Sequence, residues 1–368
     1  FVTNITESVE SEWRGLSLPL MFPIGHNIRH CSLAELEEYF QEKGMPKFRA
    51  KQVYEWIWQK KAMHFADMTN LSKELRQQMG EQFTLPALQV DQIQVSEDGT
   101  RKFRFRTWDG HFVEGVLIPT ELRLTACVSS QIGCSLNCKF CATGYIDRKR
   151  NLQFDEIYDE VVLINAECEK EYGRKLTNIV FMGMGEPLLN YKQVLRSIDR
   201  ITAADGMAMS PRRITVSTAG VAKGIKQLGE DGVRFKLALS LHAANDRKRN
   251  EIMPINDSNN IQSLVEALND FYKNTGNEIT FEYILFRNFN DSLADADELI
   301  KLYRQVPADL VNLIEYNPID QARFEKPTEQ KVEAFMEYLG KNRVNVRLRR
   351  SRGQDIDAAC GQLANKVG

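Results

Sequence analysis

From residue 123 onwards, short apolar runs alternate with longer stretches whose apolar residues recur at helical spacing. The apolar runs predict strands at Leu124–Ser130, Asn178–Met182, Arg213–Ser217, Lys236–Ser240, Thr280–Phe286 and Val311–Asn317. The stretches between them predict helices at Phe154–Tyr172, Lys192–Ala204, Val221–Leu228, Ile261–Asn274, Ser292–Gln305 and Glu329–Gly340. Six strand–helix units predict an α/β fold with a parallel sheet curved into a partial (β/α)6 barrel, followed by a strand at Val344–Arg350.

Two other patterns precede this barrel. Ser32 and Glu35 form a capping-box signature and Ser72 reads as a second N-cap, so three short helices are expected between residues 31 and 86. Residues 87–122 alternate between apolar and polar around Asp98-Gly99 and Asp109-Gly110, which predicts hairpins. The expected parts are a lead segment at 1–30, a small helical domain at 31–86, a β-hairpin extension at 87–122 and the barrel domain at 123–368.

The composition is that of an ordinary globular protein, with 43% hydrophobic and 27% charged residues. No apolar run is long enough to span a membrane. Pro19 and Pro23 interrupt the apolar patch Leu16–Ile24, which argues against a signal peptide. We therefore expect a reduced, cytoplasmic protein. We also expect it to be a monomer. The net charge of −2 does not decide whether nucleic acid is a partner, so local clusters of charge must.

The segment ACVSSQIGCSLNCKFCAT contains Cys134, Cys138 and Cys141 at C-x3-C-x2-C spacing. Three neighbouring thiolates can hold an iron–sulfur cube and leave its fourth iron open to a small chelating molecule. A zinc site ordinarily needs four ligands, often as two C-x2-C pairs, and the sequence has no second pair. Seven cysteines in a long chain without a secretory segment also disfavour a disulfide framework.

The residues of chemical interest all follow predicted barrel strands, which is where β/α barrels place their active sites. The cysteine triplet follows the first strand, and the turn Gly183–Glu186 follows the second. The third, fourth and sixth strands end at Ser217, at Ser240–His242 and at Asn317. The pattern therefore predicts a single site on one rim of the barrel.

The triplet, with an aromatic residue before its last cysteine, resembles the signature of radical S-adenosylmethionine (SAM) enzymes. The longer strings CVSSQIGCSLNCKFCAT, GMGEPLLN and RGQDIDAACGQL resemble a narrower family, which methylates carbon 2 of adenine in bacterial large-subunit ribosomal RNA and transfer RNA. The resemblance extends from about Ser32 to the C-terminus. It implies a radical SAM barrel, a [4Fe-4S] cluster on Cys134, Cys138 and Cys141, and two SAM molecules per turnover.

The resemblance also implies roles for single residues. Gly185 and Glu186 match the turn that holds the methionine amino group of SAM; glycine lets backbone approach a ligand, and a carboxylate pairs with an ammonium. The other SAM-contacting positions of the family are matched by Ser217, Ser240, Leu241, His242 and Asn317. Without the resemblance, each of these would be an ordinary residue at the end of a strand.

Carbon 2 of adenine is not nucleophilic, so a direct methyl transfer from SAM cannot work there. The resemblance implies an indirect route through a methylated cysteine. Cys360 takes a methyl group from one SAM, and a 5′-deoxyadenosyl radical made from a second SAM removes hydrogen from it, so that the resulting carbon radical adds to the ring. Cys127 then resolves the adduct through a transient disulfide with Cys360. Glu114 matches the proton acceptor proposed for the family. Cys31 and Cys168 are interpreted as buried hydrophobic residues.

Basic residues gather at several places along the chain. Lys47, Arg49, Lys51, Lys60 and Lys61 are interleaved with the aromatic residues Phe48, Tyr54, Trp56 and Trp58. Beside an RNA-modifying site, this stretch predicts that residues 31–86 bind RNA. Phosphate contacts are also expected from Arg347, Arg349, Arg350, Arg352, Arg212, Arg213, Arg247, Lys248 and Arg249. The expected partners are ribosomal and transfer RNA and a reductant such as flavodoxin or ferredoxin, with no membrane.

Two alternatives remain open from the sequence. A related family methylates carbon 8 of adenosine, is associated with resistance to ribosome-targeting antibiotics, and shares the triplet and both accessory cysteines. Pro187 in GMGEP and the string RGQDIDAACG favour the carbon-2 family. The other alternative is a non-catalytic iron–sulfur protein that binds RNA, for which the SAM-contacting positions would have no role.

Overall fold

The computed structural model describes residues 22–365, and the chain divides into two compact units, Phe1–Pro86 and Ala87–Gly368. In the described part of the first unit, the helices are α1 (Leu33–Glu42), α2 (Phe48–Trp58) and α3 (Lys73–Gln82). The predicted capping box forms, because Ser32 accepts from the Glu35 amide and donates its own amide to the Glu35 carboxylate at 2.6 Å. Residues 1–21 of the predicted lead segment lie outside the described residues.

Helix α2 divides the basic and aromatic stretch between core and surface. Trp58 and Ile57 are buried, so they hold the helix against its neighbours. Lys51 and Lys60 are exposed, and the Lys60 ammonium lies 4.0 Å from the ring centre of Trp56. The exposed cations are therefore the part of this stretch that a polyanion can reach.

A ten-stranded sheet runs through the second unit in the order β14-β13-β12-β11-β10-β9-β6-β5-β4-β3. Seven strands are parallel: β6 (Leu124–Cys127), β9 (Asn178–Phe181), β10 (Ile214–Thr218), β11 (Lys236–Ser240), β12 (Ile279–Leu285), β13 (Leu310–Glu315) and β14 (Val346–Arg349). The hairpin strands β3 (Gln89–Val95), β4 (Arg101–Arg106) and β5 (Phe112–Pro119) continue the same sheet in antiparallel pairing. The predicted hairpins thus form one edge of the barrel sheet.

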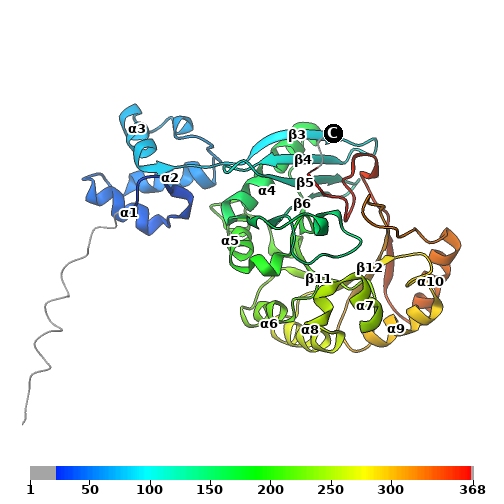
Figure 1. Cartoon of the computed structure of the whole chain (residues 1–368). Coiled ribbons are helices and arrows are strands. Elements are labelled where there is room, and N and C mark those ends of the chain that lie inside the picture. Colours follow the sequence, from blue (N-terminus) through cyan, green and yellow to red (C-terminus); the bar gives the residue numbers. More distant parts are fainter. Residues whose placement is uncertain (1–21, 366–368) are drawn as a thin grey trace, which may run out of the picture. The chain divides into compact units, whose positions relative to one another are not determined.

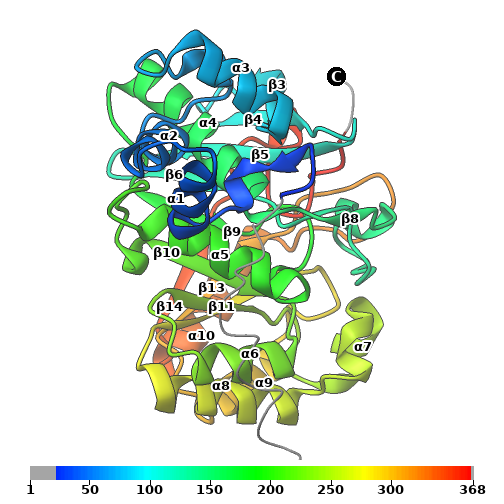
Figure 2. The same cartoon turned by 90° about the vertical axis from the view of Figure 1, so that its left-hand side faces the viewer.

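Helices lie around the outside of the curved sheet, which confirms the partial barrel (Figure 1). They are α4 (Phe154–Tyr172), α5 (Tyr191–Thr202), α6 (Ala222–Glu230), α8 (Ile261–Thr275), α9 (Leu293–Tyr303) and α10 (Glu329–Lys341). Figure 2 shows the same layering from the side, with α5 and α6 over the strands. One further helix, α7 (Asp246–Ile252), was not predicted; Asn245 caps it by accepting from the Lys248 amide.

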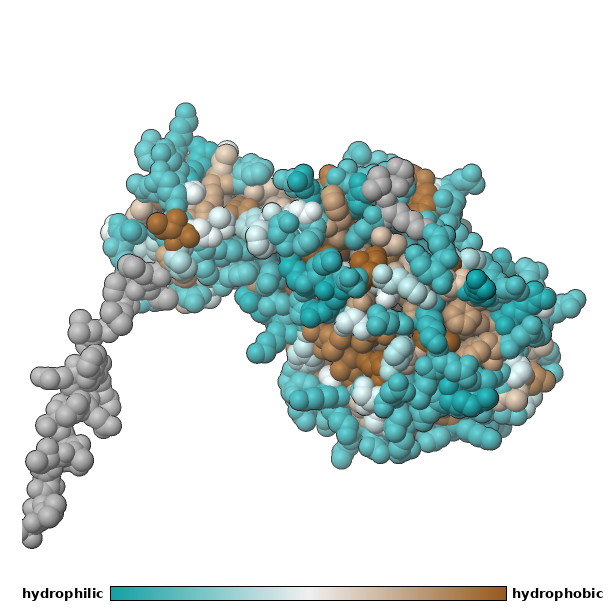
Figure 3. Space-filling model, viewed as in Figure 1, coloured by the Kyte–Doolittle hydropathy of each residue, from teal (hydrophilic) through white to brown (hydrophobic). Residues whose placement is uncertain are grey.

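Parallel strands end on one rim of a barrel, so this topology brings the predicted site residues toward a common place. The antiparallel pairing of β5 with β6 sets Val116 opposite Cys127 and so ties the hairpin edge to the first barrel strand. Figure 3 shows hydrophobic residues gathered in the middle of the larger unit's visible face, with hydrophilic residues around them. Among the described helices, none has the length and apolar character that crossing a membrane requires.

Candidate functional site

The cysteine triplet lies in the loop after β6, and hydrogen bonds and close packing fix the conformation of this loop. The Lys139 amide donates to the Ile252 carbonyl at 3.0 Å. Gly144 leaves no room for a side chain, because a Cβ there would lie 2.9 Å from the Cys138 carbonyl oxygen. Cys138 and Cys141 pack against an apolar cluster that includes Phe140. All three cysteines line one cavity of about 850 Å³, which we call the cofactor cavity.

The chemistry of these thiols fits an iron–sulfur cube. Burial raises the pKa of Cys134 to about 11, and burial followed by the neighbouring Cys141 and Cys134 raises that of Cys138 well above its usual value. The three thiols therefore need a strongly cationic group beside them before they can ionise together. No group of His, Cys, Asp and Glu within residues 22–365 could hold a single metal ion. A cube differs from a single ion because each cysteine binds a different iron.

The turn between β9 and α5 brings Glu186 to the same cavity. Gly185 has φ +92°, and a Cβ there would lie 2.5 Å from the Cβ of Gln131. The Glu186 amide donates to the Gln131 side-chain oxygen at 2.9 Å. Backbone thus packs directly on the short strand β7 (Gln131–Ile132), and both Gly185 and Glu186 line the cofactor cavity.

The Glu186 carboxylate is buried but has room for a cation. Its oxygens accept from the Leu188 amide at 3.0 Å and from the Ala219 amide at 2.7 Å. Burial raises the pKa of this carboxyl, and the two amides oppose that rise. The Thr218 hydroxyl is a third donor to this carboxylate, so one of its four lone pairs remains to accept from a ligand ammonium in the cavity.

Three further predicted residues meet at the same cavity. The hydroxyl oxygens of Ser217 and Ser240, at the ends of β10 and β11, lie 3.2 Å apart. His242 accepts from the Ile284 amide through Nδ1 at 3.1 Å. Burial, and then the charge of Arg249, lower the pKa of His242 to about 3, so the neutral ring carries its proton on Nε2. All three residues line the cavity.

Leu241 and Asn317 are not among the residues that line this cavity. The Leu241 carbonyl accepts from Arg249 Nε at 3.1 Å. Asn317 Nδ2 donates to the Cys360 carbonyl at 3.1 Å, and Asn317 Oδ1 accepts from Gln354 Nε2 at 2.7 Å. In this structure, therefore, Leu241 fixes a buried arginine and Asn317 fixes the chain around Cys360.

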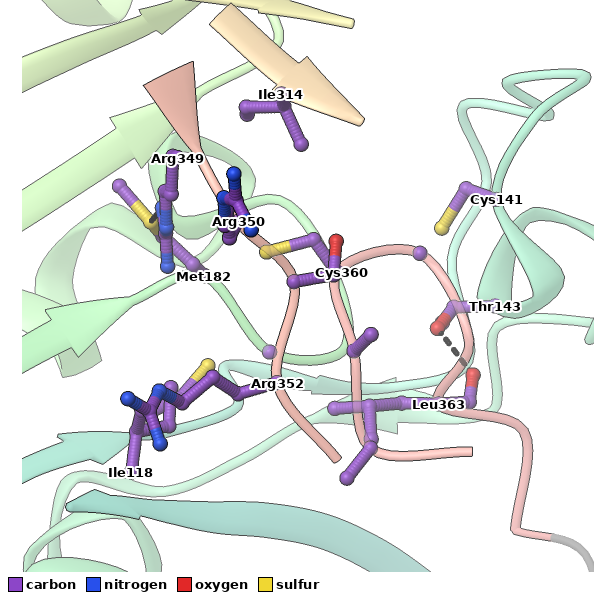
Figure 4. A pocket seen from close by; sticks show the side chains of 16 residues that line it. Ile118, Cys141, Thr143, Met182, Ile314, Arg349, Arg350, Arg352, Cys360 and Leu363 are labelled. Atoms are coloured by element: carbon purple, nitrogen blue, oxygen red, sulfur yellow. Dashed lines mark hydrogen bonds between the residues drawn. The ribbon is translucent and has the colours of Figure 1, made fainter. Parts of the chain in front are cut away.

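A second cavity, of about 700 Å³, contains both accessory cysteines, and we call it the thiol cavity. Cys127 ends β6, and Cys360 lies in the segment after β14 (Figure 4). Burial, and then the nearby Cys360, raise the pKa of the Cys127 thiol to about 12. Cys141 and Cys360 each line both cavities, so the accessory thiols adjoin the triplet loop.

Sequence reasoning missed an ion pair in this region. Arg349 Nη1 lies 3.6 Å from Glu282 Oε2, and Arg349 lines both cavities. Attraction to Cys360 is the largest of the effects that raise the pKa of Arg349. The sequence analysis treated Arg349 as a phosphate contact. A carboxylate inside the apolar run ITFEYIL of β12 was the available signal, because an acidic residue in a buried strand needs a partner.

Glu114 lies on β5 and anchors the chain just beyond Cys360. Its Oε2 accepts from the amides of Ala364 at 2.8 Å and Asn365 at 3.0 Å. Its Oε1 lies 3.6 Å from Lys102 Nζ and has no hydrogen-bond partner. Glu114 is 1% exposed and is not among the residues that line either cavity.

The basic residues of the barrel do not form one cluster, which corrects the sequence prediction. Arg212 and Arg213 precede β10, so they lie where the parallel strands begin, on the rim away from the site. Arg249 is fully buried and donates to main-chain carbonyls, so the expectation that it contacts phosphate is wrong. Arg350 and Arg352 are exposed and line the thiol cavity.

Comparison with known proteins agrees with this geometry. Residues 26–85 match the family model for the ribosomal RNA large subunit methyltransferase N-terminal domain, and residues 128–302 match that for the radical SAM superfamily. The "Probable dual-specificity RNA methyltransferase RlmN" of Cytophaga hutchinsonii is 55% identical over 92% of this chain and 93% of its own. The "Dual-specificity RNA methyltransferase RlmN" of Geotalea uraniireducens is 42% identical over 93% of this chain and 97% of its own.

A solved structure supports the same assignment. The crystal structure of a radical SAM methyltransferase from Sphaerobacter thermophilus superimposes with a TM-score of 0.87 at 40% identity, covering 93% of this chain and all of that one. Radical SAM enzymes use SAM and a [4Fe-4S] cluster, and the cofactor cavity fits both. The chain therefore belongs to the RlmN family of dual-specificity RNA methyltransferases, which are radical SAM enzymes.

Proposed function

We propose that this protein methylates carbon 2 of adenosine in large-subunit ribosomal RNA and in transfer RNA, with Cys360 as the intermediate carrier of the methyl group. The observation that carries the proposal is the thiol cavity. Cys127 and Cys360 are far apart in sequence, yet both line this cavity, which adjoins the loop of the cysteine triplet. Two thiols are what a transfer through a methylated cysteine requires, one to carry carbon and one to release it.

In this proposal the cofactor cavity holds the cluster and SAM. Cys134, Cys138 and Cys141 bind the cluster, and Glu186 binds the ammonium of SAM. Gly185, Ser217, Ser240 and His242 contribute the remaining polar contacts of the cavity. When bound, the cluster and SAM supply a one-electron cleavage that yields a hydrogen-abstracting radical. The buried, largely apolar walls keep water from that chemistry.

Cys360 acts first, as a nucleophile. Its thiolate attacks the methyl carbon of SAM, a new S–C bond forms, and the sulfonium S–C bond breaks with release of S-adenosylhomocysteine. The S-methyl group then loses a hydrogen atom, and its carbon adds to carbon 2 of the base. The adduct becomes aromatic again by giving the carbon-2 proton to a base and one electron to the oxidised electron carrier. The Cys127 thiolate then attacks the Cys360 sulfur. The electron pair of the broken S–C bond stays with the product carbon, which takes a proton. A disulfide between the two cysteines remains and must be reduced before the next turnover.

We assign the proton acceptor to Glu114. Its Oε1 has no hydrogen-bond partner, so one carboxylate oxygen is able to take a proton while Oε2 holds the Ala364 and Asn365 amides. A general base must come within hydrogen-bond reach of the proton it removes. Since Glu114 does not line the thiol cavity here, this role requires the adjoining C-terminal segment to shift when RNA binds.

The RNA is proposed to approach the thiol cavity with its target base unstacked. Arg350 and Arg352, which are exposed beside that cavity, contact phosphates. The exposed Lys51 and Lys60 of the N-terminal unit add a second basic surface. The electron donor is a low-potential carrier such as flavodoxin or ferredoxin, and the protein acts as a monomer in the cytoplasm.

Mass spectrometry of nucleosides tests the proposal most directly. Ribosomal and transfer RNA from cells lacking this enzyme are treated with the reconstituted protein, SAM and a reductant, then digested. We expect 2-methyladenosine in both RNAs. Appearance of 8-methyladenosine would favour the carbon-8 reaction, and absence of both 2-methyladenosine and 8-methyladenosine would contradict both. A Cys168→Ala variant is the matched control for cysteine substitutions in the thiol cavity and should keep full activity. Cys168 is buried away from both cavities and donates only to the Arg174 carbonyl.

A further inference from the structure

The wall of the cofactor cavity includes the segment that carries Cys360. Cys360 and Gly361 line this cavity together with the residues proposed to hold SAM. The Gly361 carbonyl also accepts from the Ala142 amide at 2.7 Å, directly beside the triplet. The cavity is therefore complete only when residues 353–365, which we call the catalytic segment, are docked on the barrel.

One side-chain amide pair fastens the catalytic segment at this wall. Asn317, two residues beyond β13, donates to the Cys360 carbonyl at 3.1 Å and accepts from Gln354 Nε2 at 2.7 Å. A backbone carbonyl can only accept, so the Asn317 amino group must face Cys360 and its oxygen must face Gln354. Gln354 presents its amino group to the Asn317 oxygen, so it stabilises Asn317 in the orientation that binds Cys360. Both partners of Asn317 belong to the catalytic segment.

Asn317 keeps hydrogen-bonding capacity after these two contacts. Its amino group has a second N–H, and its oxygen has a second lone pair. At 2% exposure, Asn317 is not in contact with bulk water, so this remaining capacity faces the protein interior, and Asn317 does not line the cofactor cavity. Because Cys360 lines the cavity and Asn317 binds its carbonyl, a ligand in the cavity can act on Asn317 only through Cys360.

The other attachments of the segment differ from this pair. Asp98 Oδ2 accepts from the Gly353 amide at 3.0 Å, and Glu114 accepts from the two amides at the far end. Gln362 Nε2 donates to the Pro318 carbonyl at 3.2 Å. These contacts hold the segment to the barrel and to the β3–β4 turn, but none of them touches Asn317.

We propose that Gln354 is a positioning residue which, through Asn317, couples docking of the catalytic segment to binding of SAM in the cofactor cavity. The inference rests on the proposed cofactor site. Because coupling between two events is reciprocal, docking raises the affinity for the ligand by the same factor by which the ligand favours docking. The enzyme would then bring Cys360 into place only when a methyl donor is present.

Hydrogen exchange of the catalytic segment tests this coupling. The cluster-reconstituted protein is measured with and without S-adenosylhomocysteine, which fills the site but has no methyl group to transfer. Binding is measured separately by equilibrium dialysis. We expect the ligand to slow exchange of the segment amides at least about 5-fold, the lower end of typical couplings. In the Gln354→Ala variant, the slowing should fall below about 2-fold and the ligand should bind correspondingly more weakly.

The Gln362→Ala variant is the matched control. It removes a glutamine tether from the same segment to the residue next to Asn317, so it should speed exchange with and without ligand while leaving their ratio unchanged. The Gln354→Ala and Asn317→Ala effects on that ratio should not add, since both act through one contact. If ligand binds and Gln354→Ala keeps the full ratio, the coupling is refuted while the cofactor site stands. If S-adenosylhomocysteine does not bind at all, the cofactor assignment fails and this inference fails with it.

Discussion

Gly185 offers the sharpest test of how the turn proposed to bind SAM is built. At this position two separate demands exclude a side chain. The backbone has φ +92°, and an added Cβ would lie 2.5 Å from Gln131 Cβ, 2.7 Å from Gln131 Cγ and 2.9 Å from the Gln131 amide nitrogen. The last of these atoms belongs to backbone and cannot rotate away. We therefore predict that Gly185→Ala destabilises the fold and displaces Glu186 from the cofactor cavity.

The two demands can be given magnitudes. A left-handed backbone costs an alanine about 1–2 kcal/mol. Forcing a methyl group into a packed contact adds about 1–3 kcal/mol. The free energy of unfolding should therefore fall by about 2–5 kcal/mol. Gly232 supplies the matched control, because it has φ +62° and nothing lies within 4 Å of its added Cβ. The Gly232→Ala variant should lose only the conformational part, about 1–2 kcal/mol.

Urea unfolding of both variants, followed by circular dichroism, measures the difference. Equilibrium dialysis with S-adenosylhomocysteine then reports whether the turn still presents Glu186. We expect the Gly185 variant to be the less stable of the two and to lose ligand affinity, while the Gly232 variant keeps it. Equal losses of stability in the two variants, within about 0.5 kcal/mol, would show that the close approach to Gln131 does not constrain the turn.

Further predictions concern the thiols and the catalytic segment. Cys360→Ala should abolish RNA methylation, whereas Cys127→Ala should accumulate a covalent protein–RNA adduct visible on denaturing gels; a fully active Cys360→Ala variant would overturn the two-step scheme. Burial alone would raise the pKa of Asp98, but hydrogen bonds from Thr100 and the Gly353 amide outweigh it and lower that pKa below its ordinary value. Because its pKa is lowered, the Asp98 carboxylate stabilises the docked segment at pH values above the unfolded pKa of about 3.9. This stabilisation is lost as the pH falls through the pKa of Asp98 in the folded protein. Reactivity of Cys360 toward a pyridyl disulfide should therefore rise below about pH 4, and reactivity that stays constant down to pH 3 would contradict this.

Several site residues could be found from the sequence because local pattern and spacing define them. The triplet needs only three cysteines within one loop, and the loop brings them together whatever the rest of the chain does. Ser217, Ser240 and His242 were placed at strand ends by periodicity, and parallel topology then guarantees that those ends share a rim. All three line the cofactor cavity.

Other residues were misjudged because a sequence shows that a residue is charged but not how deeply it is buried. Arg249 reads as part of a basic run, yet it is fully buried and satisfies the carbonyls of strand ends. Arg349 reads as one of four arginines beside the catalytic segment, yet it faces Glu282 between the two cavities. Side-chain direction on a strand depends on register, and register at the edge of a sheet is fixed by pairing with β13 rather than by local residues.

The sequence by itself determined the parallel α/β barrel, the cysteine triplet and the glycine turn, since each depends on spacing within a few residues or on the alternation of strand and helix. Only the tertiary structure decided that Cys127 and Cys360 share a cavity, that Glu114 and Asn317 hold the catalytic segment, and that Arg349 pairs with Glu282. The contacts of Cys127 and Glu114 bring the segment after edge strand β14 to the distant strands β6 and β5, whereas Asn317 and Glu282 act from the neighbouring strands β13 and β12. These contacts arise from the way the sheet curves and the C-terminal segment folds back across it, which no local pattern encodes.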